Sequence, residues 1–244
     1  MVRCLRLTDR VYLIGGGAYG YSAPNDCNIY LVDCGGALAV IDTGGGGGIP
    51  RVLENIRHMG FDPETVEMAF ITHCHYDHIG GNHDLKEATG CRIAAHEAEV
   101  QEIETLGELT LYDMARERGL KFEPAKVDIT LTDGQHVRVG EVDFEVVHTP
   151  GHTPGGVCLL IKEDDVVSLF TGDTASAQGH LGWINGPGCD LPEWKRSIKR
   201  LLELKPDRMF PGHGVFVLSG AVDHLKLLDE KMNAPWINIV TSIG

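Results

Sequence analysis

The heptapeptide Thr72-His73-Cys74-His75-Tyr76-Asp77-His78 holds three histidines and one aspartate in one short stretch of the chain. It follows the apolar run Met68-Ala69-Phe70-Ile71 and precedes Ile79-Gly80-Gly81, so we expect it where a buried strand enters a turn. Imidazole and carboxylate groups together suit zinc, manganese or iron. Because no pair of cysteines accompanies them, a purely structural zinc site is disfavoured. The heptapeptide therefore predicts a metal site that supports chemistry.

Three further candidate ligands, each flanked by glycine or proline, lie downstream of the heptapeptide. His152 stands in Thr149-Pro150-Gly151-His152-Thr153-Pro154-Gly155, Asp173 in Thr171-Gly172-Asp173-Thr174, and His213 in Pro211-Gly212-His213-Gly214. The glycines allow the backbone to turn sharply and to approach an ion closely. Together with the heptapeptide, these residues predict two metal sites.

The composition is that of a globular protein with an acidic surface. The 244 residues are 43% apolar and 23% charged, and 21 basic against 35 acidic residues give a formal charge of −14. Because no cluster of Lys and Arg is present to neutralise phosphates, we expect no nucleic-acid partner. No segment approaches the ~18 apolar residues needed to span a bilayer, so no membrane association is expected. Seven scattered cysteines without a C-x-x-C pair, and no signal-peptide core, predict reduced thiols in a cytoplasmic protein.

The order of predicted elements repeats. Strands, a helix, a strand and a helix fill roughly residues 1–125, and strands, a helix, a strand and a helix fill 126–244. This order predicts two sheets packed face to face with helices outside, in one domain that spans residues 1–244. We expect strands at 11–14, 28–32, 38–41, 68–71, 92–94, 129–131, 136–139, 143–147, 157–161, 166–170 and 209–210, and helices near 50–59, 83–87, 96–118, 191–204 and 221–232.

These motifs resemble the metallo-β-lactamase superfamily over about residues 8–230. The H-x-H-x-D-H pattern, the loops around His152, Asp173 and His213, and the early turn Asp42-Thr43-Gly44 carry the resemblance. It implies an α/β fold, the αβ/βα four-layer sandwich, and a dinuclear site with two divalent metal ions, zinc being favoured over iron or manganese. The resemblance assigns His73, His75 and His152 to the first ion. It assigns Asp77, His78 and His213 to the second, and makes Asp173 the bridging ligand.

Elementary geometry agrees with this ligand set. His73 and His75 alternate along an extended backbone and can aim the same way, whereas Cys74 points elsewhere and is expected to be a packed thiol. We expect Asp42 to accept a hydrogen bond that orients a ligand imidazole. His148 is expected to support the site as a structural residue. Candidates for substrate contact, chosen from the neighbouring glycine-rich loops and the heptapeptide, are Tyr19, Tyr21, Tyr76, His180 and Trp183.

Two glycine-rich stretches invite a nucleotide-binding interpretation that the sequence disfavours. Gly15–Gly20 satisfies G-x-G-x-x-G, but the strand-like segment 21–32 follows it where a dinucleotide fold needs a helix. Gly44–Gly48 lacks the G-K-[ST] ending of a phosphate-binding loop. We therefore expect a hairpin over the site in the first case and an ordinary loop in the second.

The leading functional hypothesis is hydrolysis of an ester, thioester or lactone carbonyl in a small-molecule substrate. A metal-bridged hydroxide would attack the carbonyl, and Asp77 would act as the catalytic residue that orients the hydroxide and carries a proton to the leaving atom. A bridging Asp173 resembles the glyoxalase II and lactonase branches of the superfamily. One alternative is a mononuclear iron oxidoreductase similar to the persulfide dioxygenases, which would use His73, His152 and Asp173. Another is a non-catalytic ligand-binding protein that retains the metal site, and the sequence leaves a homo-oligomer open.

Overall fold

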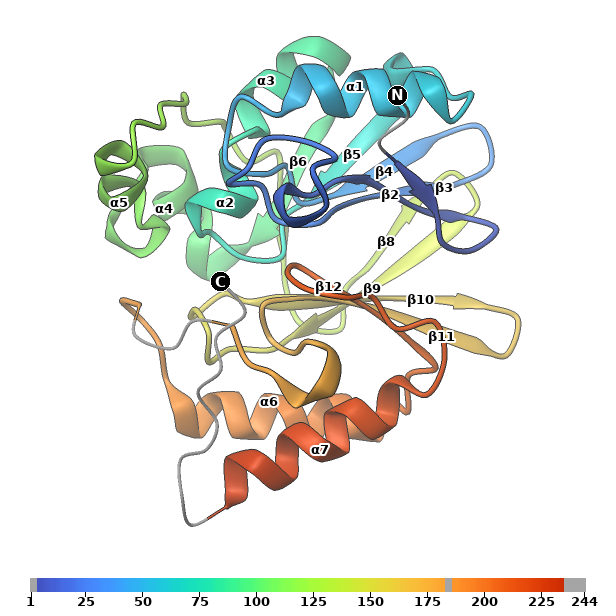
Figure 1. Cartoon of the computed structure of the whole chain (residues 1–244), viewed down its shortest axis with the longest axis vertical. Helices are drawn as coiled ribbons and strands as arrows, with labels where there is room; N and C mark the ends of the chain where they lie inside the picture. Colours follow the sequence, from blue (N-terminus) through green and yellow to red (C-terminus); the bar gives the residue numbers. More distant parts are fainter. Residues whose placement is uncertain (1–3, 183–185, 235–244) are drawn as a thin grey trace. The chain divides into compact units, whose positions relative to one another are not determined.

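A computed structural model describes residues 4–182 and 186–234 and divides the chain into two compact units. The N-terminal unit comprises Met1–Leu131 and Arg138–Val142, and the C-terminal unit comprises Thr132–Val137 and Asp143–Gly244. Each unit contains a sheet and the helices that pack on it (Figure 1). The expectation that the whole chain is a single domain stays a prediction.

The N-terminal unit is built on a seven-stranded sheet whose strands follow their order in the sequence. The first four strands pair antiparallel, and the last three join in parallel, which requires helical crossovers between them. Parallel strands bring their carboxyl ends to one edge of the sheet, where β5 delivers the heptapeptide. The strands are β1 (Leu5–Arg6), β2 (Val11–Gly15), β3 (Ile29–Asp33), β4 (Leu38–Ile41), β5 (Val66–Phe70), β6 (Arg92–His96) and β7 (Ile129–Leu131).

Helices α1 (Ile49–His58) and α3 (Asn82–Thr89) cover one face of this sheet (Figure 1). Val52 and Ile56 of α1 pack in one hydrophobic core with alternate strand residues such as Leu31 and Val40. Pro50 lies in the first turn of α1, a position that proline fits. The opposite face of the strands is buried as well, which explains their continuous apolar character.

The region 96–118 is a series of short helices and not the extended helical segment that its composition predicts. Leu106 and Leu111 adopt left-handed backbone angles, with φ of 51° and 57°, and each ends a helical turn. The pieces are η3 (Glu97–Glu99), α4 (Val100–Thr105), η4 (Glu108–Thr110) and α5 (Tyr112–Glu117). The unit also contains η1 (Gly17–Tyr19), η2 (Pro63–Thr65) and the short helix α2 (Tyr76–Ile79), which the sequence did not predict.

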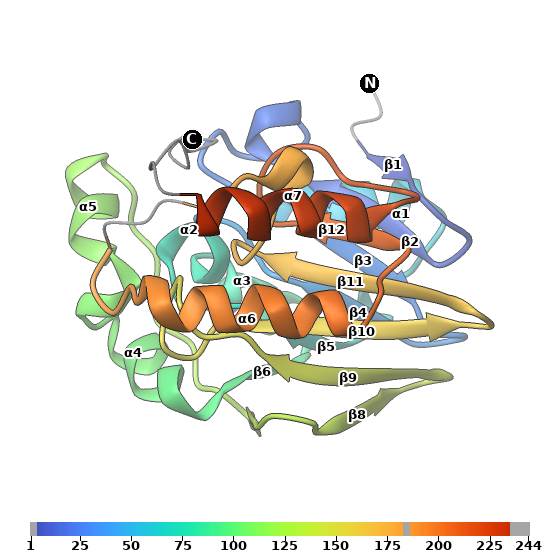
Figure 2. The same ribbon diagram turned by 90° about the horizontal axis from the view of Figure 1, so that it is seen from below.

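The C-terminal unit has a five-stranded sheet in the order β12-β11-β10-β9-β8, with α6 (Leu191–Glu203) and α7 (Ala221–Asn233) packed on it (Figure 2). Trp194 and Ile198 of α6 share a hydrophobic core with Leu225 of α7 and with Leu160 and Leu169 of the sheet. The strands are β8 (His136–Val139), β9 (Val142–His148), β10 (Val157–Glu163), β11 (Val166–Gly172) and β12 (Arg208–Pro211), and η5 (Ala177–Gly179) follows β11.

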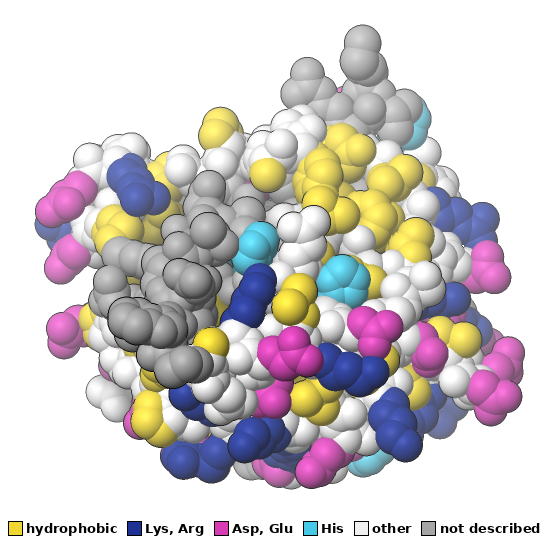
Figure 3. Space-filling view, turned by 60° about the horizontal axis from the view of Figure 1, so that its bottom comes forward, with side chains coloured by type: hydrophobic (Ala, Val, Ile, Leu, Met, Phe, Trp, Pro, Cys, Tyr) yellow, Lys and Arg dark blue, Asp and Glu magenta, His cyan; other side chains and the backbone are white. Residues whose placement is uncertain are grey.

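Apart from the region 96–118, the predicted strands and the four other helices agree with the structure to within two residues at each end. Charged side chains of both signs are interspersed on the face where α6 and α7 lie (Figure 3). Several form pairs within one helix, such as Arg196 with Glu193 and Lys226 with Asp223. In the described part of the chain, no helix has the length and hydrophobicity to cross a bilayer.

Candidate metal centre

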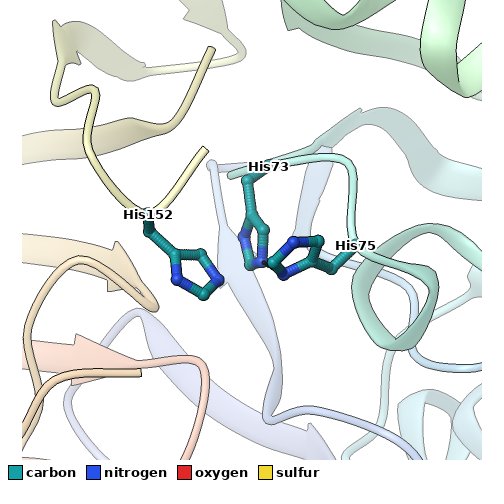
Figure 4. Close-up of side chains that lie close together, drawn as sticks. All are labelled: His73, His75 and His152. Atoms are coloured by element: carbon teal, nitrogen blue, oxygen red, sulfur yellow. Dashed lines mark hydrogen bonds between the residues drawn. The ribbon is translucent and has the colours of Figure 1, made fainter. Parts of the chain in front are cut away.

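The histidines of the heptapeptide are buried and gathered at the end of β5. His73 and His75 project from the segment that follows this strand, and the Nε2 atom of His73 lies 3.1 Å from the Nδ1 atom of His75 (Figure 4). The ring of His78 lies 4.0 Å from the ring of His73, measured between centroids. Alternate residues therefore aim the same way, as the extended backbone predicts. Imidazole nitrogens gathered in this way suit the binding of a cation.

Cys74 lies between these histidines but points to the other side of the chain. Its side chain is fully buried in the hydrophobic core with Ile71 and Ile79. Burial, followed by the charge of Glu99, raises the pKa of the Cys74 thiol well above its usual value. The thiol therefore stays protonated, and the prediction of a packed cysteine is confirmed.

Asp77 and His78 come after the chain turns into helix α2. The Nδ1 atom of His78 lies 2.9 Å from the Oδ2 atom of Asp42, and its Nε2 atom lies 3.9 Å from the Oδ2 atom of Asp77. The Asp42 contact leaves the Nε2 atom as the ligand nitrogen and places it beside a carboxylate. Asp42 also accepts hydrogen bonds from the backbone N–H and the hydroxyl of Thr72, both at 2.8 Å. The structure thus shows the hydrogen bond by which Asp42 was expected to orient an imidazole.

Helix α2 packs against the loop 44–48, and this loop is held by Asp26, a residue that sequence reasoning did not single out. This buried carboxylate accepts a hydrogen bond from the N–H of Gly45 at 2.8 Å, and burial raises its pKa. A Cβ at Gly80 would collide with the backbone of Gly45, so glycine is required where the two segments touch. The hydroxyl of Thr43 donates to the carbonyl oxygen of His78 at 3.0 Å. The glycine-rich stretch 44–48 therefore acts as a loop that supports the site.

The C-terminal unit gathers its three candidate ligands from the ends of three strands. His152 follows β9, Asp173 follows β11 and His213 follows β12, and Figure 4 shows His152 projecting from its loop. The Nε2 atom of His152 lies 3.6 Å from the Oδ2 atom of Asp173, and the Nε2 atom of His213 lies 3.7 Å from the Oδ1 atom. Asp173 therefore presents one carboxylate oxygen to each histidine. This is the arrangement expected of a carboxylate that bridges two ions.

Trp194 of α6 holds the loops of two of these ligands. Its ring lies 5.2 Å from the ring of His152, and its indole N–H donates to the carbonyl oxygen of Thr174 at 2.7 Å. A Cβ at Gly151 would collide with the Cα atom of Trp194, so the loop approaches α6 as closely as a backbone can. The sequence predicts the helix that carries Trp194, but only the structure shows what this side chain contacts.

His148 also supports the loop of His152. Its Nε2 atom lies 2.9 Å from the carbonyl oxygen of Pro154, and its own backbone N–H donates to Asp133 at 2.9 Å. Arg200 of α6 pairs with Asp133 at 2.7 Å and donates to the carbonyl oxygen of His148. These contacts are those of the structural residue that the sequence predicts.

The residues expected to contact substrate have varied surroundings. Tyr19 and Tyr21 lie with ring centroids 5.6 Å apart, and burial is the main cause that raises the pKa of Tyr19. Burial and the charge of Lys231 lower the pKa of His180, whereas Trp183 lies outside the described residues. The segment Gly15–Gly20 contains only the 3-10 turn η1, which differs from the long helix of a nucleotide-binding loop. The contact of Tyr19, Tyr21, His180 and Trp183 with substrate stays a prediction.

Tyr76 is the remaining member of that group. It is 7% exposed, and its hydroxyl accepts a hydrogen bond from the Nη1 atom of Arg118 at 2.6 Å. Burial, followed by the charge of Asp77, raises the pKa of Tyr76. Tyr76 is therefore a neutral phenol whose hydroxyl faces an arginine that sequence reasoning did not single out.

The donor sets of both units fit divalent metal ions. Each unit offers imidazole nitrogens beside at least one carboxylate, which is the ligand chemistry of zinc, iron and manganese. One thiol, that of Cys27, lies with Asp42 and His78 in a group whose potential ligand atoms are all within 4.8 Å of one another. Burial raises the pKa of Cys27 to about 12, which disfavours a thiolate ligand.

Comparison with known proteins identifies the class. The model of the metallo-beta-lactamase superfamily matches residues 23–213, and the chain belongs to this superfamily. It is 32% identical over 216 residues to the beta-lactamase-like protein 2 homolog of Drosophila melanogaster, with 86% of this chain covered and 65% of that protein. It is 28% identical over 219 residues to the human acyl-coenzyme A thioesterase MBLAC2, with 79% and 75% covered.

A solved structure of a metallo-beta-lactamase from Cronobacter sakazakii, mutated in its HARLDQ motif, shares the fold. Its TM-score is 0.71 at 24% sequence identity, with 88% of this chain and 81% of that chain covered. The predicted fold class, the α/β fold of the metallo-β-lactamase type, is thereby confirmed. The family and its clusters of His and Asp imply divalent metal binding, and one of the relatives is named as a thioesterase.

Proposed function

We propose that this protein is a dinuclear metal-dependent hydrolase that cleaves thioesters, with esters and lactones as related substrates. The observation that carries the proposal is the position of Asp173, whose two carboxylate oxygens face His152 and His213 separately at 3.6 and 3.7 Å. A carboxylate that served a single ion would not need a histidine on each side. The arrangement therefore favours two ions over one.

The ligands of the two units would divide between the two ions. For the first ion we propose His73, His75 and His152, and for the second Asp77, His78 and His213, which is the division that the resemblance to the family implies. Asp173 would belong to both ions. When bound, the metals would lower the pKa of a water molecule and polarise the carbonyl oxygen of the substrate.

The remaining chemistry belongs to residues of the chain. Asp42 accepts the Nδ1 proton of His78 and so keeps the opposite nitrogen, Nε2, free to bind a metal. The carboxylate of Asp77 lies 3.9 Å from that nitrogen and could hold a proton and release it to the leaving sulfur or oxygen atom. Protonation of a thiolate or alkoxide makes the cleavage of the tetrahedral intermediate easier.

The substrate class is supported by the human relative, whose name describes an acyl-coenzyme A thioesterase. The iron oxidoreductase alternative needs only three of the seven candidate ligands. It gives no role to the His78–Asp42 pair or to the second histidine beside Asp173. All seven cysteines are free thiols, which agrees with the expected cytoplasmic location that stays part of this proposal.

Metal analysis combined with a substrate screen tests the proposal. Protein purified without added metal should contain close to two equivalents of divalent metal and should hydrolyse a thioester faster than a β-lactam. One equivalent of iron, together with oxygen uptake on a glutathione persulfide, would instead establish the oxidoreductase. A full metal complement without turnover of any ester, thioester or lactone would favour the non-catalytic ligand-binding protein.

A further inference from the structure

Arg118 links the chain after α5 to the metal-binding heptapeptide. It is the exposed residue at the end of α5, and its Nη1 atom donates to the hydroxyl of Tyr76 at 2.6 Å. The guanidinium carbon lies 6.0 Å from the centre of the tyrosine ring, within the range of a cation–π contact. Tyr76 stands between His75 and Asp77 in the sequence, so the guanidinium contacts a residue of the heptapeptide itself.

The segment around Arg118 is itself fixed. The rings of Tyr112 and Phe122 lie 4.8 Å apart, one on each side of Arg118 in the sequence. The backbone N–H of Leu120 donates to the carbonyl oxygen of Ala115 at 2.9 Å, which closes the chain over the end of α5. The arginine therefore extends from an ordered turn, so its position beside Tyr76 is defined by the fold.

In the part of the chain that the structure describes, Arg118 differs from most arginines because no carboxylate pairs with it. Within residues 4–182 and 186–234, Arg118 forms no ion pair, although the chain has 35 acidic and only 21 basic residues. Arg116, two residues earlier, pairs with Asp113 at 3.4 Å. Arginines paired with a carboxylate are Arg6, Arg10, Arg51, Arg116, Arg196, Arg200 and Arg208.

The charge of Arg118 is consequently available to a ligand. A guanidinium has five N–H donors, and the hydroxyl of Tyr76 occupies one of them. The acceptor of this bond is a hydroxyl and not a carboxylate. The planar guanidinium matches the oxygens of a carboxylate or a phosphate group and can bind two of them at once.

We propose that Arg118, positioned by Tyr76, binds an anionic group of the substrate, so that the preferred substrates are thioesters carrying a carboxylate or a phosphate. This inference rests on the proposed hydrolase function, which it narrows to anionic substrates. In a protein with a formal charge of −14, such a substrate needs a local cation to approach an acidic surface. Arg118 supplies that cation beside the heptapeptide.

The test compares wild-type protein with Arg118→Gln on three thioesters that share one acyl group. The three thioesters differ in their thiol. Coenzyme A carries phosphates, glutathione carries carboxylates, and N-acetylcysteamine is neutral. We expect kcat/KM to fall about tenfold or more for a charged thioester, mainly through KM, because a hydrogen bond to a charged group is lost. The neutral thioester should be hydrolysed at an unchanged rate, and the more affected charged thioester identifies phosphate or carboxylate as the ligand.

Two further variants separate recognition from folding. Arg118→Lys keeps the charge and should recover part of the lost activity, and Arg116→Gln removes a paired arginine of the same segment and should change all three substrates little. Equal losses on charged and neutral thioesters in Arg118→Gln, or no loss on any of them, would overturn the inference and leave the hydrolase intact.

Failure of the proposed function has a different signature. If the wild-type protein hydrolyses none of the three thioesters, the hydrolase proposal fails. Calorimetric titration with coenzyme A alone and with glutathione alone then still tests Arg118. Weaker binding of either thiol to Arg118→Gln would support the anion site, and equal binding, or binding of neither thiol to wild-type protein, would refute it.

Discussion

The two units of the protein supply candidate ligands in contrasting ways. In the N-terminal unit, His73, His75, Asp77 and His78 lie in one continuous stretch at the end of a single strand. In the C-terminal unit, three ligands come from three strand ends, between His152 and His213. A continuous set is oriented by local backbone geometry, whereas a dispersed set depends on the packing of a whole sheet.

The supports of the two sets differ as well. A buried carboxylate, Asp42, receives hydrogen bonds from Thr72 and contacts His78 in the N-terminal unit. In the C-terminal unit an aromatic side chain, Trp194, packs on His152 and hydrogen-bonds the residue after Asp173. The first support is mainly electrostatic and the second is mainly steric, so substitutions should affect them differently.

The largest effect is expected at Asp173, where a single change removes the carboxylate that faces both histidines. Asp173→Asn keeps the shape of the side chain and removes its charge, so one metal equivalent should be lost. Loss of a residue that only hydrogen-bonds a metal ligand lowers activity by up to about 100-fold, and kcat should fall by more than this when the bridging ligand itself is changed. Elemental analysis and thioester hydrolysis measure both quantities. Asp164→Asn, in an exposed turn with φ of 52°, is the matched control and should change neither. Full metal content and activity in Asp173→Asn would refute the bridging assignment.

A moderate effect is expected from Asp42→Asn in the N-terminal unit. Asp42 has φ of 59°, a conformation that asparagine also adopts, so the backbone should be preserved. Loss of the charge beside His78 should weaken the affinity for one ion by about 10–100-fold and leave the other ion bound. Metal titration followed by calorimetry measures this difference. The control variant Asp62→Asn keeps a helix cap and should bind both ions as wild-type protein does. If Asp42→Asn lowers the affinity for both ions equally, the two ligand sets do not have separate roles.

The smallest effect on metal binding is expected from Trp194→Phe, which keeps an aromatic ring against His152 but removes the indole N–H. The buried carbonyl of Thr174 would lose its donor, at a cost of about 1–3 kcal/mol in the free energy of unfolding. Metal affinity should fall by less than tenfold, because the coordinating atoms are unchanged. Ile198→Val, on the buried face of the same helix, should lower stability by about 0.5–1.5 kcal/mol without any change in metal affinity. If both variants alter metal binding equally, Trp194 has no specific role in holding the ligands.

Several properties followed from the amino-acid sequence alone because they depend on neighbours in the chain. The two-residue period of an extended backbone determines that His73 and His75 share a side and that Cys74 points away. The run of apolar residues before the heptapeptide indicates a buried strand, and the helical period of 191–204 indicates a helix. The combination of motifs was specific enough to predict the superfamily, which the family match confirms.

Other properties were decided by the tertiary structure because they join residues distant in sequence. No local pattern reveals that Trp194 packs on His152 or that Asp26 holds Gly45. The helical composition of 96–118 did not show that Leu106 and Leu111 would break the helix. Only that broken path brings Arg118 to Tyr76, and only the parallel pairing of β11 with β12 places Asp173 within reach of His213. Contacts of this kind arise from the packing of whole elements, which no local pattern of residues specifies.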